Sequence, residues 1–288
     1  MHEIGYLGPP GTFTEEALLN YKSFQKEDVK EYKTIPEVIR SIGKEVKEGI
    51  VPVENSLEGS VNITLDILAG ENNLKIKREI VIPISHHLLV KDKTELNDIA
   101  TLFSHYQAVA QCRRFIEQSM PEAETELTFS TAQAAKIVSE KTKKNCAAIG
   151  TLRAANLYNL KVLRNNISDH KCNYTRFIVL SHQEASPITG KDKTSVIFGI
   201  KDGPGALYQI LKEFALREIN LTKIESRPSK KNFGDYLFFV DMQGHFEEPG
   251  VSKGIEAIKD NTVFLKVLGS YPEAELSEQN EGSTEVEV

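Results

Sequence analysis

The first 180 residues alternate short apolar runs with segments of helical periodicity, and this alternation limits the possible folds more than any other feature. Strand-like runs occupy residues 3–7, 49–53, 79–90, 99–103, 124–129 and 146–148, and helix-like segments occupy 14–24, 36–47, 108–119, 132–141 and 151–157. Strands that alternate with helices build α/β layers around a largely parallel sheet. Two such units follow one another, so we expect two lobes with a cleft where their loops face each other.

A late apolar run at residues 175–181 predicts a strand that returns to the first lobe. The first lobe then comprises about residues 1–78 together with 160–182, and the second lobe about residues 79–159. We therefore expect one two-lobed region, residues 1–182, whose first lobe is discontinuous.

The polar stretch QEASPITGKDK, residues 183–193, contains a proline and a glycine and is the predicted linker. Beyond it, residues 194–271 carry a second pattern. Strands are predicted at 194–201, 220–227, 235–242 and 262–268, and helices at 206–217 and 251–259. The order βαββαβ is typical of a ferredoxin-like unit.

The net charge of −6 comes from the C-terminal tail, residues 272–288, which holds six glutamates and no Lys or Arg. Without these six, the 41 acidic residues fall to 35 and equal the 35 basic ones. A neutral folded part without a basic stripe argues against a nucleic-acid partner. The tail itself has the composition of a disordered extension.

Three cysteines without a Cys-x-x-Cys pair indicate a reducing compartment and no zinc site. The chain starts on a strand-like run without a signal peptide, and no apolar stretch reaches 18 residues. We therefore expect a cytoplasmic protein that binds neither membrane nor metal. His86 and His87 are neighbours on a predicted strand, so they face opposite sides and make a poor chelate.

Two strand–helix turns in the first lobe are candidate binding loops. The turn LGPPGTF, residues 7–13, places Gly11 and Thr12 before a helix whose N–H groups attract anions, although an ordinary tight turn is the favoured interpretation of this motif alone. The turn at residues 51–61 presents Glu54, Asn55 and Ser56 where a strand ends. Helix capping by Asn55 or Ser56 is the alternative there.

Two further polar clusters follow later strands. Residues 103–112 include Ser104, which either caps a helix or faces the cleft, and Gln111, which shares a helix face with Gln107. Thr175 and Arg176 begin the return strand. An arginine can hold a carboxylate with two hydrogen bonds, or it can make a surface ion pair of little value.

These clusters, taken together, resemble the ordered signature of prephenate dehydratases. The motifs are GPPGTF (8–13), PVENSLEG (52–59), SHYQAVAQC (104–112), STAQAA (130–135) and NYTRF (173–177). The segments GPGAL (203–207) and IESRP (224–228) resemble ACT domains of the phenylalanine-responsive type. The resemblance extends from about residue 4 to residue 271 and leaves out only the tail.

The resemblance implies a two-lobed catalytic region of the type II periplasmic-binding-protein kind followed by an ACT regulatory domain. Such an enzyme converts prephenate to phenylpyruvate with loss of CO2 and water, uses no cofactor, and serves L-phenylalanine biosynthesis. The residues that the resemblance assigns to catalysis are Thr175, Glu54, Asn55, Ser104, Gln111 and Arg176. The residues assigned to substrate binding are Gly11, Thr12, Ser56, Ser130, Thr131 and Phe177.

The resemblance also implies feedback inhibition by L-phenylalanine bound between the ACT domains of a dimer or tetramer. The residues assigned to that allosteric site are Gly203, Gly205, Ala206, Leu207, Asn220, Leu221, Thr222, Glu225 and Ser226. Two departures from the family pattern are Tyr106 in place of a usual proline and Phe233-Gly234 in place of a tryptophan.

Two other functions remain open at this point. A two-lobed cleft and an ACT domain also suit a non-catalytic amino-acid sensor. Arogenate dehydratase acts on a substrate that differs from prephenate only by an amino group in place of a keto group. No helical segment of the chorismate mutase kind precedes residue 1, so we expect a monofunctional enzyme.

Overall fold

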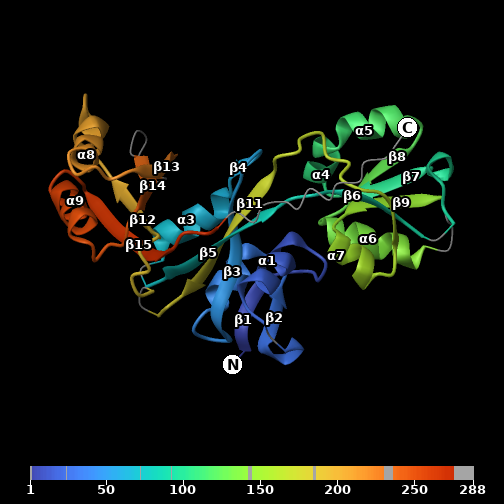
Figure 1. Ribbon diagram of the computed structural model, residues 1–288, viewed down its shortest axis with the longest axis horizontal. Coiled ribbons are helices and arrows are strands. Elements are labelled where there is room, and N and C mark those ends of the chain that lie inside the picture. Colours follow the sequence, from blue (N-terminus) through green and yellow to red (C-terminus); the bar gives the residue numbers. More distant parts are fainter. Residues whose placement is uncertain are drawn as a thin grey trace.

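Three sheets organise the described part of the chain, and each belongs to a separate unit of the molecule (Figure 1). The structure is a computed structural model that describes residues 2–23, 25–71, 73–91, 93–141, 145–183, 186–229 and 236–275. The predicted linker lies partly outside these residues. The acidic tail beyond residue 275 and the departure at Phe233-Gly234 lie wholly outside them.

The first lobe is built on a six-stranded mixed sheet. Its strands are β1 (His2–Leu7), β2 (Val29–Tyr32), β3 (Val46–Asn55), β4 (Gly59–Ser60), β5 (Lys75–Pro83) and β11 (Tyr174–Ser181), and its helices are α1 (Phe13–Tyr21), α2 (Ile35–Ser41) and α3 (Asn62–Gly70), with a 3-10 turn η1 (Lys26–Asp28). The order is β2-β1-β3-β11-β5, with β4 paired to β3. The return strand β11 runs antiparallel to both of its neighbours, β3 and β5.

The second lobe holds a five-stranded sheet. Its elements are β6 (His87–Val90), η2 (Leu96–Asp98), β7 (Thr101–Ser104), α4 (Tyr106–Gln111), α5 (Arg113–Ser119), β8 (Glu124–Leu127), α6 (Thr131–Glu140), β9 (Cys146–Gly150), α7 (Leu152–Leu157) and β10 (Lys161–Arg164). The strand order is β10-β6-β9-β7-β8, in which β7 is parallel to both neighbours.

The C-terminal unit has the predicted ferredoxin-like topology. It comprises β12 (Asp192–Gly199), α8 (Ala206–Ala215), β13 (Leu221–Pro228), β14 (Tyr236–Gln243), α9 (Pro249–Lys259) and β15 (Phe264–Pro272). The antiparallel order is β13-β14-β12-β15. Helices α8 and α9 cover one face of this sheet, and Figure 1 shows the other face turned toward α3 and β5.

The structure departs from the sequence expectations in several elements. The strand-like run at 79–90 divides into β5 and β6, which belong to different sheets, so the lobe boundary falls after residue 83 rather than at 79. Strand β10 pairs with β6 in the second lobe, although residues 160–164 were assigned to the first. The predicted helix at 36–47 ends at Ser41, because Gly43 has a positive φ of 77° and β3 begins at Val46.

The chain crosses between the lobes twice, and the two crossings run side by side. The Ile84 N–H donates to the Asn173 carbonyl at 2.8 Å, and the Ile167 N–H donates to the His86 carbonyl at 2.9 Å. A further contact joins the lobes where the Thr151 hydroxyl donates to the Gly11 carbonyl at 2.8 Å. These bonds fix how the loops of one lobe face those of the other.

The C-terminal unit shares a hydrophobic core with the first lobe. One buried cluster contains Leu65, Leu68 and Ile178 of the lobe together with Phe239 and Leu268 of the C-terminal unit. Alternation along the strands allows this, because Val240 and its neighbours Phe238 and Met242 face the helices while Phe239 faces the lobe. The unit is therefore packed against the lobe rather than attached by the linker alone.

Gly269 in β15 provides a test of this shared core. Its φ is 153°, and an added Cβ would lie 2.3 Å from the Ile76 carbonyl oxygen, a backbone atom of the first lobe. We expect Gly269→Ala to lower the free energy of unfolding by about 1–3 kcal/mol, the usual cost of overpacking, as measured by urea denaturation. The control Gly250→Ala places its Cβ in open space and should leave stability unchanged or slightly raised. Equal stability of the two variants would contradict the packing described.

Candidate active site

A cleft with a volume of about 540 Å³ lies between the two lobes. Six of the sequence-predicted site residues line it, namely Thr12, Asn55, Gln111, Ser130, Thr131 and Thr175. Phe13, Tyr106 and Phe129 supply aromatic surface to the same cleft. The cleft therefore combines polar groups with ring-sized apolar surface.

Thr175 and Asn55 form the polar centre of the first-lobe wall. They are cross-strand partners on β11 and β3, and the Asn55 side-chain amide donates to the Thr175 hydroxyl oxygen at 2.9 Å. The Asn55 side-chain oxygen, Oδ1, accepts from the backbone N–H groups of Leu57 and Glu58 at 3.0 Å each, and these two bonds fix the orientation of the side-chain amide. Because Thr175 accepts from Asn55, its own hydroxyl hydrogen is available to a bound ligand.

A chain of hydrogen bonds continues from this pair to the second lobe. The Asn55 amide also donates to Asn173 at 2.8 Å, and the Asn173 amide donates to the Gln111 carbonyl oxygen at 2.9 Å. Gln111 in turn donates to Glu58 at 3.1 Å and lies 3.1 Å from Nε2 of His86. Fully connected networks of this kind hold buried polar groups in one geometry.

His86 is the buried end of that chain. Its side chain packs edge-on against Phe13, and the Gln111 oxygen requires a hydrogen on Nε2. Nδ1 has no hydrogen-bond partner among the described residues. Burial lowers the pKa of His86 to about 4 from its ordinary 6.5, so the ring is neutral near pH 7.

The cleft is lined by no Lys or Arg among the described residues. Several helices begin at its wall, among them α1, with Thr12 at its N-cap, and α6, with Ser130 at its N-cap. The Ser130 hydroxyl accepts from the Gln133 N–H at 3.1 Å. Free N–H groups in the first turn of a helix attract anions, so the cleft can hold carboxylates without a cationic side chain.

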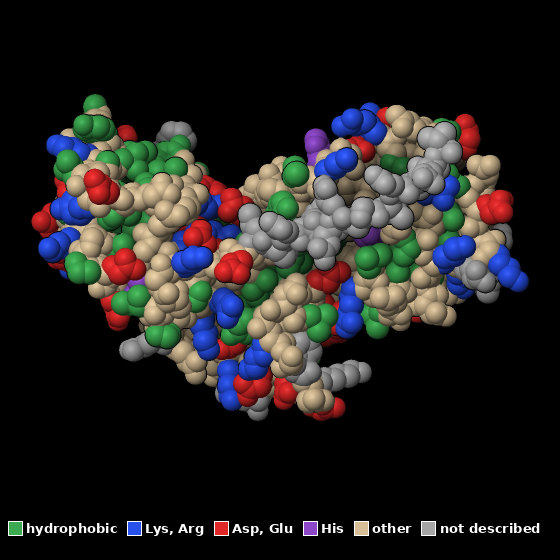
Figure 2. Space-filling model, in the orientation of Figure 1, with side chains coloured by type: hydrophobic (Ala, Val, Ile, Leu, Met, Phe, Trp, Pro, Cys, Tyr) green, Lys and Arg blue, Asp and Glu red, His purple; other side chains and the backbone are tan. Residues whose placement is uncertain are grey.

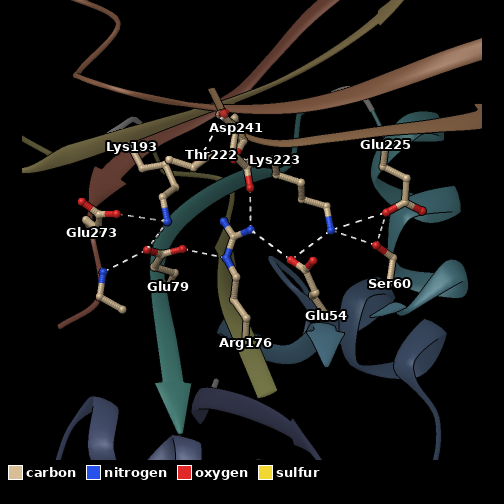
Figure 3. Close-up of polar contacts among 12 residues, drawn as sticks. Glu54, Ser60, Glu79, Arg176, Lys193, Thr222, Lys223, Glu225, Asp241 and Glu273 are labelled. Carbon is tan, nitrogen blue, oxygen red and sulfur yellow. Dashed lines mark hydrogen bonds and ion pairs between the residues drawn. The ribbon is translucent and has the colours of Figure 1, made fainter. Parts of the chain in front are cut away.

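Arg176 and Glu54 do not reach the cleft, although both were predicted to act there. Adjacent strand residues face opposite sides, so Arg176 points away from Thr175 and Glu54 points away from Asn55. Arg176 donates to Glu79 at 2.6 Å and to Asp241 at 2.5 Å, while Glu54 lies 2.9 Å from the Lys223 ammonium (Figure 3). The guanidinium that we expected to hold a substrate carboxylate is thus committed to the C-terminal unit.

The structure places four more predicted residues outside the cleft wall. The Ser104 hydroxyl is buried and donates to the Ile149 carbonyl at 2.9 Å, which ties β7 to β9. Ser56 accepts from the Tyr174 N–H, and Phe177 lies in the core of the first lobe. The Gly11 N–H donates to Glu15 at 2.8 Å and is not available to an anion.

The residues predicted for an effector site divide between two faces of the C-terminal unit. Gly203, Ala206 and Leu207 line a depression of about 170 Å³ together with Tyr236 and Phe238. Glu225 instead faces the first lobe, where it accepts from the Ser60 hydroxyl. The remaining five lie outside that depression; they are Gly205, Asn220, Leu221, Thr222 and Ser226.

Sequence reasoning missed Glu58, His86 and Asn173 as site residues. Glu58 and Asn173 lie inside two of the motifs that carry the family resemblance, PVENSLEG and NYTRF. Their place in these motifs is the sequence signal that could have identified them as site residues. Sequence reasoning considered His86 only as a metal ligand and rejected it, because His86 and His87 face opposite sides of a predicted strand. Its position in the crossing between the lobes, which brings it to the cleft, follows from the topology and not from local pattern.

Within the described ranges, no three His, Cys, Asp or Glu side chains are arranged to hold a metal ion. The helices in those ranges are also too short or too polar to cross a membrane. On the face drawn in Figure 2, Lys and Arg side chains lie among Asp and Glu rather than gathering in one patch.

Comparison with known proteins gives a consistent result over almost the whole chain. Residues 4–185 match the family model for prephenate dehydratase, and residues 194–260 match that for the ACT domain. A bifunctional chorismate mutase/prephenate dehydratase from Aquifex aeolicus is 45% identical over 96% of this chain and 75% of its own. A prephenate dehydratase from Methanocaldococcus jannaschii is 41% identical over 93% of this chain and 97% of its own.

A solved structure agrees at the level of the fold. The crystal structure of prephenate dehydratase from Arthrobacter aurescens in complex with L-Phe superposes with a TM-score of 0.87 at 35% identity, covering 94% of this chain and 90% of that one.

The lowered pKa of His86 makes stability depend on pH. Below pH 6.5 the unfolded chain binds a proton at this residue that the folded chain does not, so stability falls as the pH drops from 6.5 and levels off near 4. Between pH 7 and pH 5 we expect this residue to contribute a loss of about 2 kcal/mol. Urea denaturation at both pH values should show a smaller loss for His86→Gln than for the wild type. Identical losses in the two proteins would exclude a buried neutral His86.

Proposed function

Because the chain belongs to the prephenate dehydratase family, we propose that the cleft beside Thr175 is where it converts prephenate to phenylpyruvate, CO2 and water. The catalytic region is residues 1–182, and residues 194–271 form the regulatory ACT unit. The observation that carries this proposal is the Thr175 hydroxyl, which accepts from Asn55 and lines a cleft bounded by both lobes, so that its own hydrogen is available to a ligand there.

Prephenate is a dianion whose C4 hydroxyl and ring carboxylate leave together. One proton joins the leaving hydroxyl as the C4–O bond breaks, and the electron pair of the breaking C–CO2 bond enters the ring, which becomes aromatic. Aromatisation supplies the driving force, so the enzyme needs to orient the substrate and stabilise the departing oxygen. Thr175 donates a hydrogen bond to that oxygen, and Asn55 and Gln111 hold the surrounding polar groups in place.

The two carboxylates of the substrate need partners other than Arg176. The N-termini of α1 and α6, at Thr12 and Ser130–Thr131, provide backbone N–H groups at the cleft wall. Weak anion binding has a chemical advantage here, because a carboxylate that is to leave as CO2 loses its charge in the reaction. A full salt bridge to that carboxylate would stabilise the ground state more than the transition state.

The ACT unit is proposed to bind L-phenylalanine and to inhibit the enzyme. Gly205 has a φ of 79° at the N-cap of α8 and lets the backbone approach a ligand. The depression at Gly203, Ala206 and Leu207 carries the apolar and aromatic surface that the phenyl ring requires. L-Phe is bound to the Arthrobacter relative as well. We propose that two or four chains associate through this unit.

We also propose that the protein works in the cytoplasm. Its cysteines support this, since Cys112, Cys146 and Cys172 are all free thiols, as expected in a reducing compartment.

Thr175→Ala tests the catalytic proposal. Loss of a positioned hydrogen-bond donor should lower kcat by roughly 10²–10⁴-fold with little change in KM, while Thr175→Ser retains most of the activity. The measurement is phenylpyruvate formation from prephenate, repeated with arogenate to compare kcat/KM. A Thr175→Ala enzyme with wild-type kcat would falsify the assignment.

Gly205→Val tests the effector proposal. A β-branched residue at a φ of 79° strains the backbone. The variant should therefore need at least about tenfold more L-Phe for half inhibition, which corresponds to about 1.4 kcal/mol less free energy of L-Phe binding. Activity without L-Phe should persist. Gly190→Ala is the control, since its φ is 84° in an open turn outside the ACT sheet. Unchanged inhibition of Gly205→Val would place the effector elsewhere.

A further inference from the structure

A pair of charged side chains lies directly behind the catalytic pair. In the register of β11 and β3, Thr175 pairs with Asn55 and Arg176 pairs with Glu54. Since successive strand residues face opposite sides, the first pair faces the cleft and the second faces the ACT unit. The position of the catalytic side chains is therefore tied to whatever holds the charged pair.

Residues of the ACT unit hold both members of that charged pair (Figure 3). Asp241 accepts from Arg176 Nη1 at 2.5 Å, and the Tyr271 hydroxyl accepts from Nη2 at 2.8 Å. Lys223 lies 2.9 Å from the Glu54 carboxylate. These contacts come from β14, β15 and β13, which are three of the four strands of the ACT sheet.

The contact between Arg176 and Asp241 is shielded from water, because their side chains are only 13% and 9% exposed. The Lys223 side chain is 12% exposed, whereas that of its partner Glu54 is 36% exposed, so water screens the Lys223–Glu54 contact more. Removing Asp241 takes away the carboxylate at Arg176 Nη1 and leaves the guanidinium held by Glu79 and Tyr271. The uneven loss of a buried partner favours a shift of Arg176 toward those that remain, and β11 carries Thr175 with it.

Lys223 also reaches the wall of the cleft by a second route. It donates to the Ser60 hydroxyl at 2.8 Å, and Ser60 lines the cleft from β4, where it pairs with Glu54. A single ACT ammonium thus holds the side chain behind Asn55 and a side chain of the cleft itself.

We propose that Asp241 and Lys223 are positioning residues of the dehydration reaction, so that the ACT unit completes the active site from behind. Asp241 acts on Thr175 through Arg176, and Lys223 acts on Asn55 and Ser60 through direct contact with Glu54 and Ser60. This inference rests on the proposed function of the Thr175 cleft.

The same contacts give the effector a route to the cleft. Strand β13 carries Lys223 between Thr222 and Glu225, which the family resemblance assigns to the effector site although both lie outside the depression at Gly203. An effector that shifts β13 therefore moves the Lys223 ammonium relative to Glu54 and Ser60, which weakens the support of the catalytic pair.

The first experiment measures kcat and KM on prephenate for Asp241→Ala, Asp241→Asn and Lys223→Met in the full chain. A misplaced catalytic group costs up to about 10²-fold in rate, so kcat should fall roughly 10- to 100-fold with KM changed less than about threefold. Asp241→Asn keeps an acceptor for Arg176 and should lose less than Asp241→Ala. Wild-type kcat in all three variants overturns the proposal.

The second experiment combines Asp241→Asn with Thr175→Ala. If Asp241 acts through Thr175, its effect on kcat should largely disappear once the Thr175 hydroxyl is gone, because coupled sites are not additive. Fully multiplied losses in the double variant would make Asp241 merely structural. A Thr175→Ala enzyme of wild-type activity would instead overturn the proposed function, which separates the two failures.

Arg227→Met is the matched control. Arg227 also joins the ACT unit to the first lobe, by an ion pair with Asp66 at 2.8 Å, but this contact is on α3 and not behind the catalytic pair. The variant should lower the urea midpoint while kcat remains within about twofold of the wild type. A loss of kcat in Arg227→Met equal to that in Asp241→Asn would show that any weakening of the interface suffices, and would overturn the specific role of Asp241.

Discussion

The antiparallel pairing of β3 with β11 is the contact on which the cleft and the interface both depend. It brings Asn55 opposite Thr175 and, one residue along, Glu54 opposite Arg176. The two-residue period of a strand then sends the polar pair to one side and the charged pair to the other. A slip of one residue would reverse both assignments, and the guanidinium would enter the cleft while the hydroxyl faced the ACT sheet. The chemistry is therefore as sensitive to register as to residue identity.

Burial of the charged side chains is tolerated because each has several partners. Glu79, whose side chain is 1% exposed, accepts from both Arg176 and Lys193, so two cations compensate it. Asp241 likewise accepts from Arg176 and from the Ser195 hydroxyl. Desolvation makes such clusters weak sources of net stability, but it makes their geometry specific. Specific geometry is what a support for catalytic side chains requires, whereas an apolar interface of equal area would tolerate sliding.

The sequence predicted the fold class and the polar cluster of Thr175, Asn55 and Gln111, because these rest on periodicity and on motifs in a fixed order. It did not predict the destination of Arg176, since a motif read along the chain does not say which face of a strand a side chain occupies. The alternation of side chains along a strand would have shown that Thr175 and Arg176 point apart. It would not have identified Asp241 as the partner of Arg176, because Asp241 lies 65 residues further along the chain. His86 was not predicted as a site residue for a related reason. One apolar run divides into β5 and β6, which belong to different sheets, and this division depends on tertiary packing rather than on the local sequence pattern.

The shared core and the charged contacts make the ACT unit and the cleft thermodynamically linked. If L-phenylalanine favours an arrangement in which Lys223 no longer holds Glu54 and Ser60, then substrate bound in the cleft must disfavour L-phenylalanine by the same free energy. The size of this coupling free energy is limited by how much each ligand's contacts differ between the two arrangements of the protein, and not by how tightly either ligand binds. Typical couplings of about 1–3 kcal/mol are no larger than the cost of breaking one buried ion pair. A rearrangement confined to the Lys223 and Arg176 contacts is therefore sufficient to transmit inhibition, without separating the hydrophobic core that joins the two units.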